Sequence, residues 1–265
     1  MNAPVSAVRR RIRTLALCAG AVAAFSIQSA ARADELVVSA AASLTNAFTA
    51  IATAFEKTHP STKVALNFGA SDVLLRQIVN GAPADVFASA DETAMDKAVE
   101  ANAVVADTRH DFATNSLVMI VPSDSTLNAP SVHETIALRQ VKHIAIGDPA
   151  SVPVGRYTKA ALQREGDWDT VSAKAVVANN VRQALDYVAR GEVDAGFVYS
   201  TDAALMPQKV KVAAIVPTEK PVAYPIAIVK SSSHAADAGA FANFVRSPDG
   251  QSILAKYGFK SPASH

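Results

Sequence analysis

Residues 36–48 read LVVSAAASLTNAF, and this stretch decides the fold class. A short apolar run leads into three consecutive alanines, which are followed by Ser43. Beyond Ser43 the apolar residues recur at helical spacing: Leu44, Phe48, Ile51 and Phe55. Such a change of period is typical of a buried strand that passes through a tight turn into an amphipathic helix. The stretch therefore predicts a strand, a turn of small residues and a helix, with Ser43 at or next to the N-cap.

The position of Ser43 suggests either a simple helix cap or an anion site. The first turn of a helix has unpaired backbone N–H groups and the positive end of the helix dipole, so a serine there is well placed to help hold an oxyanion. The same order of elements returns at residues 63–78, where a strand, a turn containing Ser71 and a helix follow one another. Because the arrangement recurs, we favour an anion site over an ordinary N-cap.

Strands and helices alternate along the rest of the chain. Further apolar strands are expected at residues 85–88, 116–121, 143–146, 175–178, 193–198, 211–216 and 224–229. This alternation predicts an α/β fold with mostly parallel sheets and ligands at the C-terminal ends of the strands. Residues 151–155 should form a loop before a helix, Asn180 can cap a helix that starts at Val181, and Tyr199 follows a strand.

The first 33 residues have the pattern of a secretory signal peptide. Arginines cluster before residue 14, residues 14–27 are a short apolar stretch, and residues 31–33 read ARA, which fits cleavage after Ala33. The apolar stretch is shorter than a membrane span requires. Cys18 could instead anchor a lipid, but Leu17 precedes it where a small residue is wanted.

Removal of this segment changes the charge and the cysteine content. The whole chain has a net charge of +1, and residues 1–33 contain five arginines and no acid, so the mature chain carries −4. A chain with that charge is a poor match for nucleic acid, whose phosphates need a basic face. Cys18 is the single cysteine, so the mature chain has no disulfide and no cysteine-based metal site.

The sequence lacks the motifs of several kinds of enzyme. The six histidines are not at metal-ligand spacing, and HExxH, GxSxG, the P-loop and GxGxxG do not occur. A secreted enzyme with Ser43 or Ser71 as nucleophile would lack a histidine placed as its base. A regulatory ligand-sensing domain would lack a DNA-reading segment and does not need a signal peptide. We therefore expect a binding protein without catalysis and without a cofactor.

Motifs along essentially the whole mature chain resemble one family. They are AAASLTNA at 40–47, GAPAD at 81–85, NSLV at 115–118, GDP at 147–149, YPIAIV at 224–229 and KYGF at 256–259. Together they closely resemble the periplasmic molybdate-binding receptors (the ModA family) of bacterial ABC importers. The resemblance implies a two-lobed periplasmic binding protein of type II with its ligand in the cleft between the lobes. It implies that residues 34–115 plus 226–265 form one lobe and residues 116–225 the other.

The resemblance also implies partners and site residues. The ligand would be molybdate or tungstate, and a membrane permease with its ATPase subunit would receive it from a monomeric receptor in the periplasm. Carried over by motif, the binding groups are the hydroxyls of Ser43, Ser71 and Tyr199 and the backbone N–H groups of Val154 and Val181. Molybdenum would be held as its oxyanion by these same residues, with no protein atom on the metal itself.

Uncharged donors suit such a ligand. Molybdate at neutral pH is a fully deprotonated tetrahedral anion, so all its oxygens accept hydrogen bonds, and a matching pocket offers donors. Nearby charges then need another explanation. We expect Arg76, Arg156 and Arg182 to form ion pairs or to face solvent, with direct ligation as the alternative, and Asp72 to point outward. A receptor for another tetrahedral oxyanion such as sulfate, or for a small carboxylate, remains the alternative function, because sulfate differs from molybdate in size and not in charge or shape.

Overall fold

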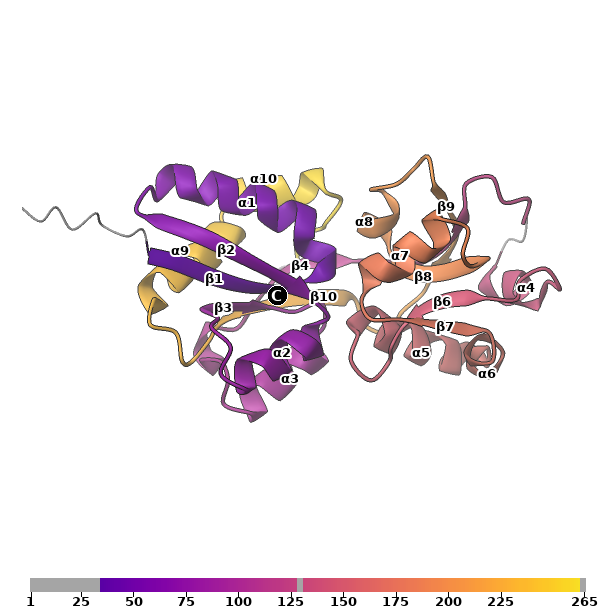
Figure 1. Ribbon diagram of the computed structural model, residues 1–265, viewed down its shortest axis with the longest axis horizontal. Coiled ribbons are helices and arrows are strands. Elements are labelled where there is room, and N and C mark those ends of the chain that lie inside the picture. The colour runs from indigo at the N-terminus through magenta and orange to yellow at the C-terminus, as the bar shows by residue number, and fades with distance from the viewer. Residues whose placement is uncertain (1–33, 128–130, 263–265) are drawn as a thin grey trace, which may run out of the picture. The chain divides into compact units, whose positions relative to one another are not determined.

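The computed structural model describes residues 34–127 and 131–262, all within one compact unit of the chain, Ala33–His265. The expected signal peptide, residues 1–33, lies outside the described residues. The described chain forms two five-stranded sheets with helices packed against each (Figure 1). We call the first sheet with its helices lobe 1 and the second with its helices lobe 2. Each sheet has one antiparallel strand among parallel ones, so the predicted α/β class with mixed, mostly parallel sheets is confirmed.

The sheet of lobe 1 has the strand order β2-β1-β3-β10-β4. Its strands are β1 (Asp34–Ala41), β2 (Thr62–Gly69), β3 (Val86–Ala88), β4 (His110–Asn115) and β10 (Val222–Ile228). β10 is antiparallel to both its neighbours, β3 and β4. It inserts into the centre of the sheet although it lies more than 100 residues beyond β4 in sequence. Lobe 1 is therefore assembled from both ends of the described chain.

Helices cover both faces of this sheet. They are α1 (Thr45–Thr58), α2 (Ser71–Val79), α3 (Glu92–Glu100), α9 (Ala235–Arg246) and α10 (Pro248–Lys256), with short 3-10 turns η1 (Ala42–Leu44) and η2 (Ala106–Thr108). The chain moves from β1 to β2 in one direction across the sheet and from β2 to β3 in the other. Right-handed crossovers then place α1 and α2 on opposite faces. Figure 1 shows α1, α9 and α10 on one face and α2 and α3 on the other.

Lobe 2 repeats this plan with the strand order β7-β6-β8-β5-β9. Its strands are β5 (Leu117–Pro122), β6 (Ile144–Gly147), β7 (Ala175–Ala178), β8 (Ala195–Tyr199) and β9 (Val210–Val216). Its helices are α4 (Val132–Ala137), α5 (Pro153–Glu165), α6 (Trp168–Ser172), α7 (Val181–Ala189) and α8 (Ser200–Ala203). β5 is the antiparallel strand, paired with β8 and β9. The helices α5 and α7 follow β6 and β7 and present their first turns at the C-terminal ends of these strands.

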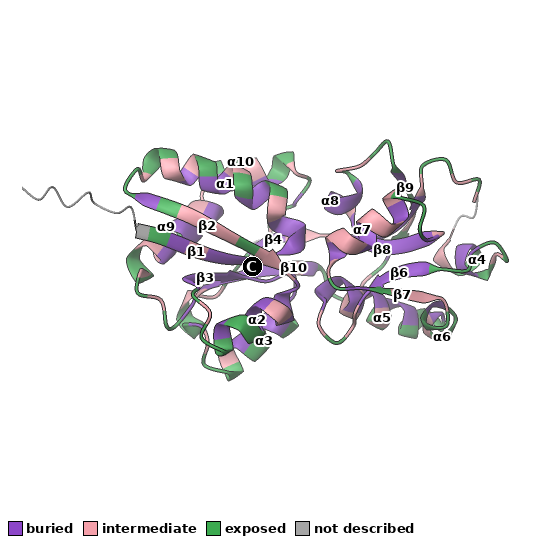
Figure 2. Cartoon of the chain, viewed as in Figure 1, coloured by how far each residue is buried: buried purple, intermediate pink, exposed green. Residues whose placement is uncertain are grey.

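The apolar stripe predicted for the first helix packs into the core of lobe 1. Phe48, Ile51 and Phe55 are fully buried. The ring of Phe241 in α9 lies 6.0 Å from that of Phe48 and 5.3 Å from that of Phe55, centroid to centroid, in edge-on contacts. Buried residues also predominate in the inner strands of both sheets, whereas the edge strands are more exposed (Figure 2). Burial on both faces explains why strands such as β3 and β8 are apolar throughout.

Several short or edge elements were not predicted from the sequence, among them β4 and α6. β4 reads HDFATN, and of its residues Phe112 and Ala113 are buried. Because β4 lies at the edge of its sheet, it has little apolar surface to cover and its sequence lacks a strand pattern. α6 is five residues long, which is too short for a helical period to show.

The chain passes between the lobes twice, from β4 to β5 and from β9 to β10. We propose that these passages bound the domains. The first passage is at Ser116, between β4 and β5, and the second lies between Val216, the end of β9, and Val222, the start of β10. The proposed lobe 1 is then 34–115 plus 222–262, and lobe 2 runs from 117 to about 217.

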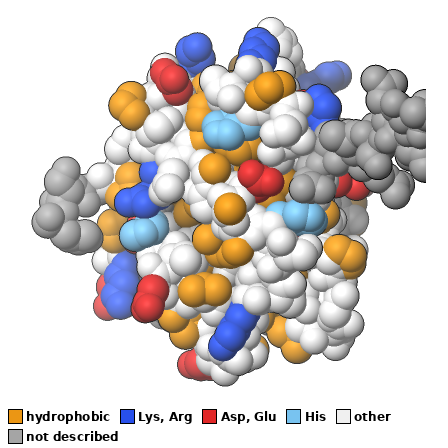
Figure 3. Space-filling model, turned by 90° about the vertical axis from the view of Figure 1, so that its left-hand side faces the viewer, with side chains coloured by type: hydrophobic (Ala, Val, Ile, Leu, Met, Phe, Trp, Pro, Cys, Tyr) orange, Lys and Arg blue, Asp and Glu red, His pale blue; other side chains and the backbone are white. Residues whose placement is uncertain are grey.

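Two further observations concern the described helices and one face of the surface. Among the described helices, none has the length and apolar character needed to cross a bilayer. On the face that Figure 3 shows, basic and acidic side chains are interspersed with hydrophobic ones, and no continuous basic field is seen among the coloured side chains. That face therefore lacks the basic surface that nucleic acid requires.

Candidate functional site

A small cavity lies between lobe 1 and lobe 2, and all five predicted site residues line it. It leaves about 10 Å³ for the centre of a water molecule, roughly the room for one water. The lining residues are Ala41, Ala42, Ser43, Gly69, Ala70, Ser71, Ala90, Val152, Pro153, Val154, Asn180, Val181 and Tyr199. They stand at the C-terminal ends of β1, β2, β3 and β8 and at the first turns of α2, α5 and α7, where ligands of α/β sheets gather. The lining contains no acidic and no basic side chain.

Ser43 lies next to the N-cap of the first helix, as predicted, and does not cap it. It lies in the 3-10 turn η1, and the N-cap of α1 is Leu44, without a side-chain bond. The extra turn carries Ser43 past the end of β1, where it is 2% exposed. Its hydroxyl oxygen accepts a hydrogen bond from the phenol of Tyr224 at 3.1 Å. Ser43 is thus a buried hydroxyl at the cavity wall and not a cap.

Ser71 is the first residue of α2, directly after the N-cap Ala70. It is fully buried. Its hydroxyl oxygen accepts from the backbone N–H of Ala90 at 3.1 Å. Ala90 itself lines the cavity, although the sequence analysis did not single it out; its place just after a buried strand is the feature it shares with Ser43 and Ser71.

Val154 and Val181 lie in the first turns of two helices. Residues 151–155 were expected to form a loop, but α5 begins at Pro153, so Val154 is already helical. Proline at this first position loses nothing, since its N–H would be unpaired there anyway. Val181 begins α7, and Asn180 caps it by accepting from the N–H of Gln183 at 3.0 Å, as predicted. First-turn N–H groups have no acceptor within their helix, so both valines offer backbone donors.

Tyr199 ends β8 and is 1% exposed. Its hydroxyl donates to the backbone oxygen of Ala90, across the cavity in lobe 1, at 3.4 Å. That bond is long, so the hydroxyl retains the capacity to turn to a better acceptor. Burial, and then the neighbouring Tyr224, raise the pKa of Tyr199 well above its usual value. The phenol therefore keeps its proton and remains a donor at neutral pH.

Charged side chains form a partly buried cluster beside the cavity. Arg156 of α5 donates from Nη2 to Asp72 Oδ2 at 2.6 Å and from Nε to Asp91 Oδ2 at 2.7 Å. Lys97 of α3 completes the cluster with a 2.6 Å contact from Nζ to Asp72 Oδ1. The expectation that Asp72 points outward is wrong in one respect, because the side chain is buried between two cations, although it does not line the cavity. Pairing with Lys97 and Arg156 makes its burial beside an anion-type pocket tolerable.

Arg182 forms a second set of contacts across the lobes. It donates from Nε to Asp202 at 2.6 Å within lobe 2. It also donates to Asn46 Oδ1 at 2.8 Å and to the backbone oxygen of Ser43 at 3.0 Å in lobe 1. Burial raises the pKa of Asp202 to about 6, against the opposing effect of Arg182. Arg76 is exposed, so all three arginines follow the predicted pairing or solvation and none lines the cavity.

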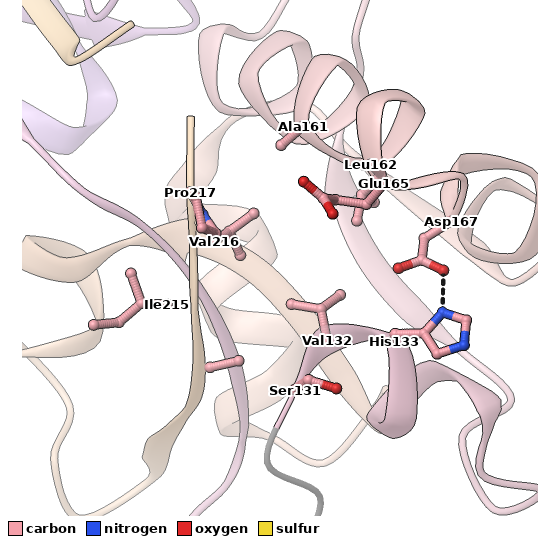
Figure 4. A pocket seen from close by; sticks show the side chains of 11 residues that line it. Ser131, Val132, His133, Ala161, Leu162, Glu165, Asp167, Ile215, Val216 and Pro217 are labelled. Atoms are coloured by element: carbon pink, nitrogen blue, oxygen red, sulfur yellow. Dashed lines mark hydrogen bonds and ion pairs between the residues drawn. The ribbon is translucent and has the colours of Figure 1, made fainter. Parts of the chain in front are cut away.

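A larger cavity lies elsewhere, in lobe 2, and has a volume of about 380 Å³. Its walls include Glu165, Asp167, His133 and the exposed strand residue Ile215 (Figure 4). His133 Nδ1 lies 2.6 Å from Asp167 Oδ1. Two carboxylates make this cavity unsuited to an anion, and no predicted site residue lines it. In the part of the chain that the structure describes, no three His, Cys, Asp or Glu side chains are grouped so as to hold a metal ion.

Comparisons with known proteins show the family of the chain. A family model described as "Bacterial extracellular solute-binding protein" matches residues 36–260. The molybdate-binding protein ModA of Escherichia coli (strain K12) is 42% identical over 252 residues, which cover 92% of this chain and 97% of the relative. The solved structure of the periplasmic molybdate-binding protein of Azotobacter vinelandii superposes with a TM-score of 0.74 at 28% identity, covering 86% of this chain and 99% of that one.

A third similarity bears on the fold alone. The sulfate-binding protein SubI from Mycobacterium tuberculosis H37Rv superposes with a TM-score of 0.76 at 20% identity, covering 87% of this chain and 88% of that one. Two sheets joined by two crossings, with a cavity between them at the strand ends, define a two-lobed solute-binding protein. The chain belongs to the bacterial extracellular solute-binding protein family, which includes the ModA proteins it matches. The predicted family resemblance is thereby confirmed.

Proposed function

We propose that this protein is a periplasmic receptor that captures molybdate, and tungstate with it, and delivers the anion to an ABC importer. One observation carries the proposal: Ser43, Ser71, Val154, Val181 and Tyr199 converge on one cavity that has no charged side chain in its lining. Hydroxyls and first-turn N–H groups can all donate. The name of the Escherichia coli relative supports molybdate as the ligand.

Neutral donors are sufficient for tight binding. A hydrogen bond to a charged group contributes roughly 1.5–3 kcal/mol. About six such bonds exceed the roughly 8–10 kcal/mol of a micromolar to submicromolar binder, even after the cost of ordering two lobes. A carboxylate in the lining would repel a dianion, and the buried pairing of Asp72 keeps that charge away from the cavity. A protonated anion such as hydrogen phosphate would need an acceptor that the predicted donors do not supply.

The proposed mechanism is capture without catalysis. Donors come from both lobes, so all of them reach one anion when the lobes are closed, and ligand binding then favours the closed state. The closed receptor would dock on a membrane permease coupled to an ATPase subunit, as a monomer. A signal peptide cleaved after Ala33 would bring the chain to the periplasm. Membership of an extracellular solute-binding family supports this location.

Isothermal titration of the mature chain with molybdate, tungstate, sulfate and phosphate tests the proposal. We expect tight binding of molybdate and tungstate and far weaker binding of sulfate and phosphate. Charge and shape are the same for sulfate, so cavity size has to make that distinction. Tight binding of sulfate together with no response to molybdate would replace the proposed ligand with the alternative one.

Tyr199 provides a test of the site itself. We expect Tyr199→Phe to weaken molybdate binding by roughly tenfold or more, since one charge-assisted bond is lost and 1.4 kcal/mol corresponds to a factor of ten. Ring packing is retained, so thermal unfolding should change little. Tyr187→Phe, on α7 of the same lobe and outside the cavity lining, is the matched control. An affinity equal to that of the control would remove Tyr199 from the binding site.

A further inference from the structure

Behind the cavity a chain of hydrogen bonds leads from the crossing between the lobes to Ser43. Asn115, the last residue of β4, donates from Nδ2 to the phenolic oxygen of Tyr224 at 3.2 Å. Tyr224 in β10 donates in turn to Ser43 Oγ at 3.1 Å. Neither Asn115 nor Tyr224 lines the cavity. Their hydrogen-bonded link to the cavity lining is through Ser43.

The orientation of the Asn115 amide is fixed by its other contacts. Its Oδ1 accepts from the backbone N–H of Ser116 at 2.9 Å and from Ser200 Oγ at 2.9 Å. A backbone N–H can only donate, so the oxygen of the amide must face it and the nitrogen must face Tyr224. The amide nitrogen has no acceptor capacity, and Tyr224 therefore receives a hydrogen bond from it.

Because Asn115 donates to Tyr224, the direction of the hydrogen bond between Tyr224 and Ser43 is also determined. Tyr224 is fully buried, and Ser43 Oγ is the acceptor that its described contacts offer to the phenolic hydrogen. The reverse arrangement would leave a buried phenolic hydrogen without an acceptor, which costs more than a hydrogen bond normally contributes. Burial also raises the pKa of Tyr224 well above its usual value, so the phenol stays protonated. Ser43 thus accepts from behind, and its own hydrogen is left for the cavity.

The hydroxyl of Ser71 is oriented in the same way, by a single hydrogen bond from the main chain. The backbone N–H of Ala90 donates to Ser71 Oγ at 3.1 Å, and this donor cannot reverse. Both serines of lobe 1 therefore accept from the protein and have their hydrogens free for a ligand. For Ser71 the main chain imposes the orientation, whereas for Ser43 two side chains do so, and those can be changed by mutation.

We propose that Tyr224 and Asn115 are positioning residues that hold the Ser43 hydroxyl as an obligate donor toward a fully deprotonated oxyanion. This inference rests on the proposed function. A serine without such a partner can turn its hydrogen away or accept from a ligand, and part of its contribution to anion binding is then lost. Asn115 also donates to Thr201 of lobe 2 at 2.9 Å, so the chain of bonds begins at a residue that contacts both lobes.

A double-mutant cycle separates this role from a structural one. Tyr224→Phe removes the hydroxyl and keeps the ring, which packs edge-on against Phe112, Tyr199 and Phe259. We expect it to weaken molybdate binding by about fivefold to tenfold in the wild-type background, as measured by titration calorimetry. In a Ser43→Ala background the same change should have no effect, because the residue through which Tyr224 acts is gone. Tyr257→Phe, in lobe 1 and outside the cavity lining, is the matched control.

Asn115→Ala gives a second variant should Tyr224→Phe prove unstable, and thermal unfolding of every variant monitors the fold. The effect of Asn115→Ala on molybdate affinity should likewise be smaller in the Ser43→Ala background. The inference is overturned if Tyr224→Phe leaves the affinity unchanged, or if it lowers affinity by the same factor in both backgrounds, since the tyrosine then acts independently of Ser43. A wild-type protein that is folded but does not bind molybdate would overturn the proposed function, and this inference with it.

Discussion

At the scale of single residues, the negative charges of the acids beside the cavity are neutralised by ion pairs with basic side chains. Asp72 directly follows the site residue Ser71 in sequence and would oppose anion binding if it were free. Arg156 and Lys97 each lie 2.6 Å from one of its two oxygens. Breaking one partner of a buried pair costs far more than the pair itself contributes. The pairing therefore adds little net stability, and its consequence for the site is that the charge of Asp72 is neutralised beside the pocket.

Glu92 gives a prediction for pH dependence. Burial, and then a hydrogen bond with Asp111, raise the pKa of Glu92 to about 7, although Arg109 opposes the shift. Between its ordinary pKa near 4.5 and about 7 the folded protein keeps a proton that the unfolded chain has released. The free energy of unfolding from this group therefore falls as pH rises through that window. We expect Glu92→Gln to flatten that decline, measured as Tm from pH 5 to pH 7.5.

The control for this prediction is Glu100→Gln, an exposed glutamate at the end of the same helix. It should follow the wild-type pH profile. A Glu92→Gln profile that parallels the wild type across the window would show that Glu92 titrates in the folded state as it does in the unfolded chain.

The sequence identified residues whose roles depend on local order and missed those that depend on distant contacts. Ser71, Val181 and Tyr199 follow strands or begin helices, and a pattern of strand, turn and helix is visible over some fifteen residues. Tyr224 contacts Ser43 from 181 positions away. No local pattern predicts such a contact, so neither Tyr224 nor Asn115 was predicted from the residues to support the site.

At the scale of elements, the cavity consists of strand ends and first helical turns, and their spacing depends on close packing. An added Cβ at Gly155 would lie 2.1 Å from the backbone oxygen of Gly147 and 2.6 Å from its carbonyl carbon. The first turn of α5 is thus pressed against the end of β6. Val154, one position earlier, is held in the cavity wall by that contact. The sequence shows the glycine, but the need for it appears when α5 and β6 are seen together.

Gly155→Ala is therefore expected to displace the start of α5. Backbone-to-backbone overlap of this kind costs about 1–3 kcal/mol or more, and the N–H of Val154 moves with it. We expect a lower Tm and at least a tenfold loss of molybdate affinity in calorimetry. Gly239→Ala is the matched control, because the added Cβ in α9 would lie 3.7 Å from Ile228 Cδ1, an ordinary contact. Alanine within a helix should raise stability by about 0.5–1 kcal/mol. Unchanged affinity in Gly155→Ala would show that binding does not need Val154 in its present position.

At the scale of the whole molecule, two arginines of lobe 2 join the lobes. Arg156 reaches Asp72 and Asp91, and Arg182 reaches Asn46 and the backbone of Ser43. Both arise in the first turns of α5 and α7, next to Val154 and Val181. Two of the five groups that would hold the anion and the two arginines that join the lobes thus lie on the same two helices. The alternation of strands and helices predicted the α/β class and the family resemblance implied two lobes, but pairs 65 or more residues apart, such as Arg156 with Asp91, could not be read from either.

Arg156→Gln tests whether these contacts favour closure. Glutamine removes the charge that Asp72 and Asp91 share, so without anion the variant should have a larger radius of gyration in small-angle X-ray scattering than the wild type. Saturating molybdate should bring both to the same value, because donors from both lobes still meet at the anion. The affinity of the variant should fall, since part of the binding free energy then goes into closing the lobes. Arg190→Gln, an exposed arginine of lobe 2 that lies 3.8 Å from Glu192, should change neither quantity. If Arg156→Gln and this control have the same radius of gyration without molybdate, the ion pairs of Arg156 are a consequence of lobe closure and do not favour it.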